Sequence, residues 1–460
     1  MPLVVLSILG TLVQHSIPVQ VNPRVELLSI IFRLAEADEY SMAPADAPYV
    51  KRVDSHFGKY KDHPAVKYAL KVREESGIGF DAVASFAVHL RTDNFAFKMA
   101  DSDLRKSLSS RWKLDDAKAF AKLLEQFTKA TDANGFFASE AKFYRQAAES
   151  LSHELAKYPY SAWFDGMFGV RKNAPFSAIP GLLNGGANYG MTVTYPRARM
   201  EILPILGTVY DSTGLPVYDS DDRARVVHEF CHTYTNGYVD ATWDSFGDSA
   251  ERIFPSRKAI LADQAYGSAK VMIQESLVRA MTVKFAQERM SSSEAKEALA
   301  AEHRRGFFWT KRLVDLIDQF QSERKQYPKF KDFMPRVAEF FRREAADLET
   351  NLAKIPKIES TSIRAGETVS PGVNILKVKF DRPMIAGRKG LIGATLTPWP
   401  DGSSGGHWSP DGTSVEFNLK LEPNKAYRYQ FGNMYGESYE SKEGFPFEPA
   451  ILEFKTSDLS

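Results

Sequence analysis

Cysteine is nearly absent from this chain, which holds a single one, Cys231, in 460 residues. One thiol cannot form an intrachain disulfide or a metal site built from several thiolates. We interpret Cys231 as a small buried residue of a predicted helix. Net charge is also small, because 59 Lys and Arg residues face 58 Asp and Glu residues. Without a basic stripe, the composition gives no reason to expect binding to nucleic acid.

Long apolar runs are missing as well. None reaches the roughly 20 residues that a transmembrane helix needs, so no transmembrane segment is predicted. Residues 1–13 are mostly apolar and could be the core of an export signal, but no basic residues precede them. Gln14-His15-Ser16 is also a poor cleavage site. Residues 1–20 are therefore either a signal or a first buried strand.

The length predicts more than one domain, and 43% apolar with 25% charged residues is a globular composition. Residues 21–160 show mostly helical periodicity, and residues 161–355 mix strands with helices. Residues 356–460 alternate apolar and polar positions between Gly- and Pro-rich turns, which indicates a β-sandwich. The predicted fold class is multidomain α+β. Predicted helices cover residues 25–34, 65–75, 80–90, 115–130, 140–157, 224–235, 265–287, 293–319 and 332–353. Predicted strands cover 176–180, 189–195, 201–210, 373–380, 414–419, 426–431 and 451–454.

The most informative motif is His228-Glu229-Phe230-Cys231-His232, an H-E-x-x-H segment in a chain with only nine histidines. Residues four apart lie on one face of a helix, so both imidazoles can point at one metal ion. Glu229 would then lie beside the remaining metal position. This pattern predicts a zinc site with His228 and His232 as ligands.

A catalytic zinc usually has a third protein ligand, and two acids are candidates. Glu275 has three apolar residues among its four neighbours at helical spacing, so its carboxylate should be buried and need a strong partner. An ordinary intrahelical pair with Arg279 would also satisfy it, and Arg279 could instead orient a ligating carboxylate. Asp240 is the alternative ligand, although an acid after a helix end is often a turn residue.

With zinc bound, Glu229 could act as general base on a metal-activated water and then protonate the departing amine. A further donor should stabilise the oxyanion. Tyr266 is the candidate, nine residues before Glu275, and Tyr234, Tyr238 and Tyr189 compete with it.

The residues before the motif suggest where a substrate binds. Asn188, Tyr189 and Gly190 open a predicted strand after the turn Asn184-Gly185-Gly186-Ala187. An exposed edge strand can bond to a peptide backbone, and we predict this segment as substrate-binding. An ordinary hairpin would explain the glycines equally well.

The segments His228 to His232 and Gln274 to Ala280 resemble the gluzincin clan of zinc metallopeptidases. The chain is more closely similar to a bacterial family of gluzincin type catalogued as a domain of unknown function, through Val21 to Leu28 and Asn188 to Gly190. This resemblance implies a zincin-like domain over residues 21–355, with zinc at His228, His232 and Glu275. Residues 356–460 resemble bacterial Ig-like modules.

These resemblances imply a secreted or cell-envelope zinc peptidase that acts on a peptide or protein substrate. The glutamate that would hold a free N-terminus is missing, which favours an endopeptidase. The Ig-like module implies association with the cell surface. The alternative is a surface adhesion or binding protein whose peptidase fold is no longer catalytic, but the complete H-E-x-x-H motif counts against it.

Overall fold

The computed structural model describes residues 17–171, 173–218, 220–387, 390–393, 406–433 and 438–458. The prediction of a signal or first strand at residues 1–20 lies mostly outside these residues, although Val19 forms a parallel bridge with Ala178. The fold is multidomain α+β, as predicted, and about half helical with several small sheets. By its contacts the chain forms two compact units, Met1–Tyr234 and Thr235–Ser460, and the division falls within helix α10.

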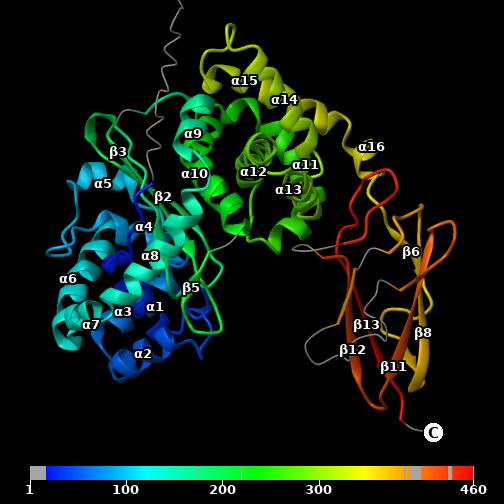
Figure 1. Cartoon of the computed structure of the whole chain (residues 1–460), viewed down its shortest axis with the longest axis horizontal. Coiled ribbons are helices and arrows are strands. Elements are labelled where there is room, and N and C mark those ends of the chain that lie inside the picture. The colour runs from blue at the N-terminus through cyan, green and yellow to red at the C-terminus, as the bar shows by residue number, and fades with distance from the viewer. Residues whose placement is uncertain are drawn as a thin grey trace, which may run out of the picture. The chain divides into compact units, whose positions relative to one another are not determined.

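The first unit begins with a helical layer, drawn in blue to cyan in Figure 1. Pro23 starts the first helix, where a missing N–H costs nothing, and the Asn22 side chain accepts the Arg24 N–H at 3.0 Å. The helices of this layer are α1 (Pro23–Leu34), α2 (Pro48–Phe57), α3 (Pro64–Ser76), α4 (Asp81–His89), α5 (Asp101–Ser107), α6 (Leu114–Thr131), α7 (Ala133–Ser139), α8 (Ala141–Leu155) and α9 (Tyr160–Phe168).

A three-stranded sheet follows, in the order β1-β3-β2. Strand β3 is parallel to β1 and antiparallel to β2, which lies at the edge. Alternate residues of β2 are buried, and Tyr189, Met191 and Val193 join the apolar cluster that the helical layer also forms. The strands of this unit are β1 (Ile179–Gly181), β2 (Tyr189–Thr194), β3 (Met200–Gly207), β4 (Val209–Tyr210) and β5 (Pro216–Val217), and they lead to α10 (Ser220–Ala241).

The second unit continues with helices that are more interrupted than predicted. The prediction of one helix over residues 293–319 is wrong, because the chain breaks at Gly306, whose φ of +95° a helix cannot contain. Helix α11 was not predicted, and Pro255 lies inside it. The helices are α11 (Gly247–Ala262), α12 (Ala269–Arg289), α13 (Ser292–Arg304), α14 (Thr310–Ser322), α15 (Phe330–Ala346) and α16 (Leu348–Leu352).

The remainder is β-structure, drawn in yellow to red in Figure 1. Two four-stranded sheets have the orders β10-β11-β8-β6 and β7-β13-β12-β9, and their buried residues form one apolar cluster. The strands are β6 (Ile358–Thr361), β7 (Thr368–Val369), β8 (Gly372–Phe380), β9 (Leu391–Gly393), β10 (His407–Trp408), β11 (Ser414–Leu421), β12 (Ala426–Phe431) and β13 (Ala450–Thr456). Among the helices of the described residues, none is long and apolar enough to cross a membrane, as predicted.

One carboxyl group is fully enclosed in the helical layer. Glu26 on α1 is 0% exposed, and it accepts hydrogen bonds from the Tyr49 hydroxyl at 2.7 Å and the Leu182 N–H at 3.2 Å. Leu182 directly follows β1, so this contact ties the helical layer to the sheet. Burial raises the pKa of Glu26 to about 7, although both hydrogen bonds act in the opposite direction.

A raised pKa in the folded state makes protonation of Glu26 stabilising below pH 4.5, and this contribution disappears as the pH rises through 7. The side chain of Glu26→Gln cannot ionise. We therefore expect its free energy of unfolding to rise relative to that of the wild type by roughly 2–3 kcal/mol between pH 5 and pH 8. Urea unfolding at both pH values measures this difference. Glu125 is half-exposed, and Glu125→Gln should show no such trend. A difference in unfolding free energy between Glu26→Gln and the wild type that shrinks as the pH rises would contradict the raised pKa of Glu26.

Candidate metal centre

Helix α10 brings two imidazoles together on one face. His228 and His232 are one turn apart, and their Nε2 atoms lie 3.2 Å from each other. The ring centroids are 4.8 Å apart with an angle of 80° between the planes. Both rings are partly exposed, whereas Val227 and Phe230 beside them are buried. The helix thus presents two nitrogen ligands from a buried framework.

Helix α12 supplies the third group. Ser268 caps the start of this helix by accepting the Val271 N–H at 3.3 Å, and the following turns are almost entirely buried. Glu275 is 5% exposed. One ligand atom each from His228, His232 and Glu275 lies within 4.8 Å of the other two, and no other such group of three acidic, histidine or cysteine residues occurs in the described part of the chain.

The chemistry of these donors fits zinc. Two imidazole nitrogens and one carboxylate oxygen form a ligand set of catalytic zinc sites, whereas calcium and magnesium prefer oxygen alone. Two nitrogens bound tetrahedrally at about 2.0–2.1 Å from one ion lie about 3.3 Å apart, close to the spacing of the two Nε2 atoms. Cys231 is unsuited as a ligand because burial, and then the charge of Glu229, raises the pKa of its thiol.

A buried ion-pair network surrounds Glu275. The Arg279 Nε lies 3.3 Å from the Glu275 Oε2, and the same guanidinium binds Glu302 on α13. Burial by itself would lower the pKa of Arg279, but Glu302, Tyr266 and Glu275 together raise it above its usual value. Burial would likewise raise the pKa of Glu302, which Arg279 and Arg305 nevertheless hold below its usual value. Arg279 and Glu302 are therefore both charged at neutral pH, and Arg279 restrains one oxygen of Glu275.

Glu229 lies against the edge strand. Glu229 is 8% exposed, and its backbone carbonyl and its carboxylate both face Gly190 on β2. A methyl group on Gly190 would lie 2.7 Å from the Glu229 carbonyl oxygen and 3.1 Å from its Oε2. Only glycine lets the strand approach the helix this closely. The carboxylate that follows His228 is thus held next to the outer strand of the sheet.

A model of the family described as "Domain of unknown function (DUF4932)" matches residues 17–340. The chain belongs to this family. The DUF4932 region contains α10 and α12, and it ends before β6, the first strand of the C-terminal sheets. No curated protein and no solved structure matches the chain.

The four candidate tyrosines have different surroundings. Tyr266, in the loop between α11 and α12, accepts a hydrogen bond from Arg279 at 2.8 Å. Burial and then the charge of Glu275 raise the pKa of Tyr266, so its hydroxyl keeps a proton to donate. Tyr234 stacks on Phe168 with centroids 4.5 Å apart, on the side of α10 away from the imidazoles. Tyr238 and Tyr189 pack in other clusters, against Phe330 and in the helical layer.

The alternative ligand and the predicted substrate-binding residues make contacts within the fold. Asp240, the alternative ligand, accepts a hydrogen bond from Gln274 at 3.1 Å and pairs with Lys270 at 3.5 Å. The Asn188 side chain donates to the Gly186 carbonyl in the turn before β2 and accepts the N–H of Gly207 at the end of β3. Of the predicted substrate-binding residues, Gly190 lies against Glu229 of the H-E-x-x-H segment.

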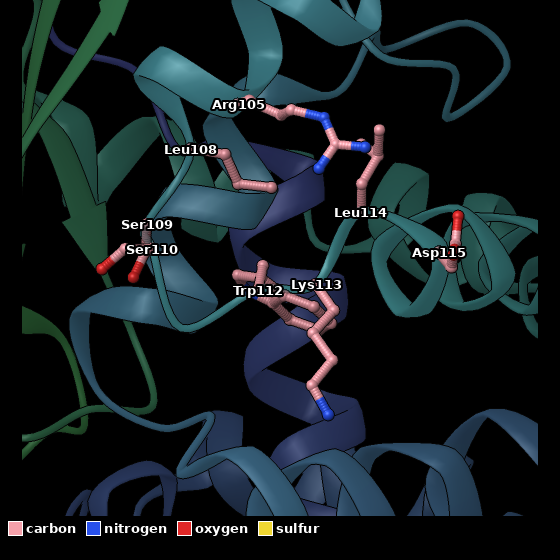
Figure 2. Close-up of a pocket in the computed structure, with 8 residues that line it drawn as sticks. All are labelled: Arg105, Leu108, Ser109, Ser110, Trp112, Lys113, Leu114 and Asp115. Atoms are coloured by element: carbon pink, nitrogen blue, oxygen red, sulfur yellow. The ribbon is translucent and has the colours of Figure 1, made fainter.

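A surface hollow of about 390 Å³ lies elsewhere in the DUF4932 region, between α5 and α6. None of its lining residues comes from α10 or α12. Figure 2 shows that the cationic ends of Arg105 and Lys113 point away from each other, so they do not converge on one anion. The lining residues are Arg105, Leu108, Ser109, Ser110, Trp112, Lys113, Leu114 and Asp115.

Glu302 is the neighbour of the candidate site that the sequence did not reveal. It lies 27 residues after Glu275 on another helix, in a segment rich in charges. The predicted pairing of Arg279 with Glu275 was local, at i and i+4, and gave no hint of a second acid. Only its burial to 5% exposure distinguishes Glu302 from the surface acids around it.

If Glu275 is the third ligand, Glu275→Ala should weaken zinc binding by roughly 100-fold or more, beyond what loss of an outer partner costs. Competition with a chromogenic chelator measures the affinity. Asp240→Ala is the matched control and should bind zinc like the wild type. The reverse result, with Asp240→Ala weak and Glu275→Ala unaffected, would exclude Glu275 as a ligand.

Proposed function

We propose that this protein is a zinc-dependent peptidase, in which His228, His232 and Glu275 hold the metal and Glu229 acts as general base. The observation that carries the proposal is the convergence of two imidazoles and one buried carboxylate, with a second carboxylate beside an edge strand. A bound zinc ion would supply a polarised carbonyl and a water molecule of lowered pKa. The resemblance to gluzincins supports the same assignment.

Each residue then has a defined task. Glu229 removes the proton of the attacking water and delivers it to the departing amine. Tyr266 donates its hydroxyl hydrogen to the developing oxyanion. Arg279 orients Glu275 by pairing with its Oε2, and Glu302 holds Arg279 in place. Strand β2 binds the substrate in extended form beside Glu229.

The substrate in this proposal is an internal segment of a peptide or protein. No acidic residue stands on β2 to hold a free N-terminus, so endopeptidase action is favoured. We assign the zincin-like fold to residues 21–355 and an Ig-like β-sandwich to residues 356–460. The shared core of the two C-terminal sheets supports a sandwich, and its resemblance to surface modules supports a location outside the cytoplasm.

Replacing Glu229 by Gln removes the base but keeps the size of the side chain. We expect kcat to fall by at least roughly 10²–10⁴-fold, because general acid–base catalysis contributes that much. Zinc content should stay the same, as measured by elemental analysis. The exposed Glu251→Gln serves as control. Activity retained in Glu229→Gln, or no chelator-sensitive hydrolysis of a peptide library by the wild type, would favour the non-catalytic binding protein.

Gly190→Ala tests the contact between β2 and Glu229. The added methyl group would press on the Glu229 carbonyl oxygen, and a displacement of about 1 Å can cost roughly 10²-fold in kcat/KM. Gly186→Ala is the matched control, because its methyl group would meet nothing within 4 Å. Thermal melting checks that both variants fold. Equal kcat/KM for the two variants would remove β2 from the site.

A further inference from the structure

The pairing of β2 with β3 decides which N–H groups of β2 point outward from the edge of the sheet. In an antiparallel pair, residues that exchange hydrogen bonds alternate with residues whose N–H and C=O point away from the partner. Gly190 lies opposite Pro204, which has no N–H to give, so this pair cannot be a hydrogen-bonded one. By alternation, Gly190, Thr192 and Thr194 all direct their N–H groups away from β3.

An independent contact agrees with the outward direction of the Thr194 N–H. The Thr194 N–H donates to the Ser107 Oγ at 2.8 Å, outside the sheet. Ser107 is the last residue of α5, so this helix closes the edge of β2 at its far end. The three outward N–H groups are therefore not equivalent, because that of Thr194 is already bonded to a side chain.

Ser107 is itself held by a buried histidine. The His89 Nδ1 lies 2.6 Å from the Ser85 carbonyl oxygen, and its Nε2 lies 2.7 Å from the Ser107 Oγ. A carbonyl only accepts, so Nδ1 carries the hydrogen and Nε2 accepts one from Ser107. Ser107 is then left to accept from Thr194. Burial lowers the pKa of His89 to about 4, which keeps the ring neutral and the direction of this chain unchanged near neutral pH.

At the other end of the strand, Gly190 lies against Glu229. A peptide that pairs with Gly190 is therefore next to the proposed general base. Residues of a paired peptide face β2 at every second position, about 6.6–6.8 Å apart. The next peptide residue to pair, two positions after the one opposite Thr192, would have to face Thr194, where Ser107 at the end of α5 already bonds to the strand.

We propose that β2 binds its substrate through Gly190 and Thr192 alone, and that Ser107, positioned by His89, ends this subsite. The peptide pairs over three residues on this side and then turns away from the strand. This inference rests on the proposed peptidase function and adds its specificity: substrates need only a short extended segment on one side of the reacting bond.

The first test uses substrate length. A peptide that the zinc-loaded protein cleaves from a random-sequence library is extended by alanine, one residue at a time, separately at each end. On the side that pairs with β2, kcat/KM should rise up to the third residue and then change less than 2-fold. A continued rise of several-fold at the fourth and fifth residues on both sides would overturn the inference but leave the peptidase function intact. If no peptide is cleaved, the proposed function fails and the inference with it.

The second test measures the hydrogen bond from Thr194 to Ser107 directly, by amide hydrogen exchange at single residues. In the free protein, the Thr194 amide should exchange more slowly than those of Gly190 and Thr192. Ser107→Ala should speed exchange at Thr194 by roughly tenfold or more, since a hydrogen bond near 1.4 kcal/mol corresponds to a factor of ten. Ser107→Thr, which keeps a hydroxyl, should restore protection, and the nearby Ser110→Ala should not change it.

The same measurement on zinc-loaded Glu229→Gln with the selected peptide bound completes the test. Binding should slow exchange at Gly190 and Thr192 and leave Thr194 unchanged. Slower exchange at Thr194 on binding, or an equally fast Thr194 amide in the free wild type and in Ser107→Ala, would show that Ser107 does not end the subsite.

Discussion

A carboxylate buried on a helix is unfavourable unless cations or hydrogen-bond donors compensate its charge, and the candidate site depends on how Glu275 meets this requirement. Arg279 pairs with it and is itself balanced by Glu302, which Arg305 also contacts. Arg279 restrains one oxygen of Glu275, whose carboxylate lies within 4.8 Å of ligand atoms of His228 and His232. Removing one member of such a network leaves a buried charge without compensation and is strongly destabilising.

The second constraint is steric. Helix α10 and strand β2 approach each other so closely at Gly190 that a side chain there would press on Glu229. The same close approach places a backbone that can pair with a peptide beside a carboxylate that can move a proton. The proposed binding strand and the proposed general base thus meet without any intervening side chain. At the other end of β2, the outward N–H of Thr194 is occupied by a hydrogen bond to Ser107, which in turn bonds to His89.

Local patterns predicted much of this organisation and failed where distant contacts decide. Helical spacing placed His228 and His232 on one face, and the apolar neighbours of Glu275 predicted its burial. Alternation located β2 to within one residue. The helix predicted over residues 293–319 is broken, because a glycine with positive φ ends it against Ile260 of another helix. Helix α11 was not predicted, and it contains Pro255, a residue type that disfavours a helix interior.

The sequence by itself determined the ligand types, the one-turn spacing of the imidazoles and the two periodicities that separate the helical region from the C-terminal strands. These depend on residues within a few positions of one another, where backbone geometry alone fixes the distance. Only the tertiary structure decided that Glu275 rather than Asp240 lies near the imidazoles, that Glu302 balances Arg279, and that Ser107 closes the edge of β2. Those contacts join residues 23 to 87 positions apart or on separate helices, and packing of the whole chain is what brings them together.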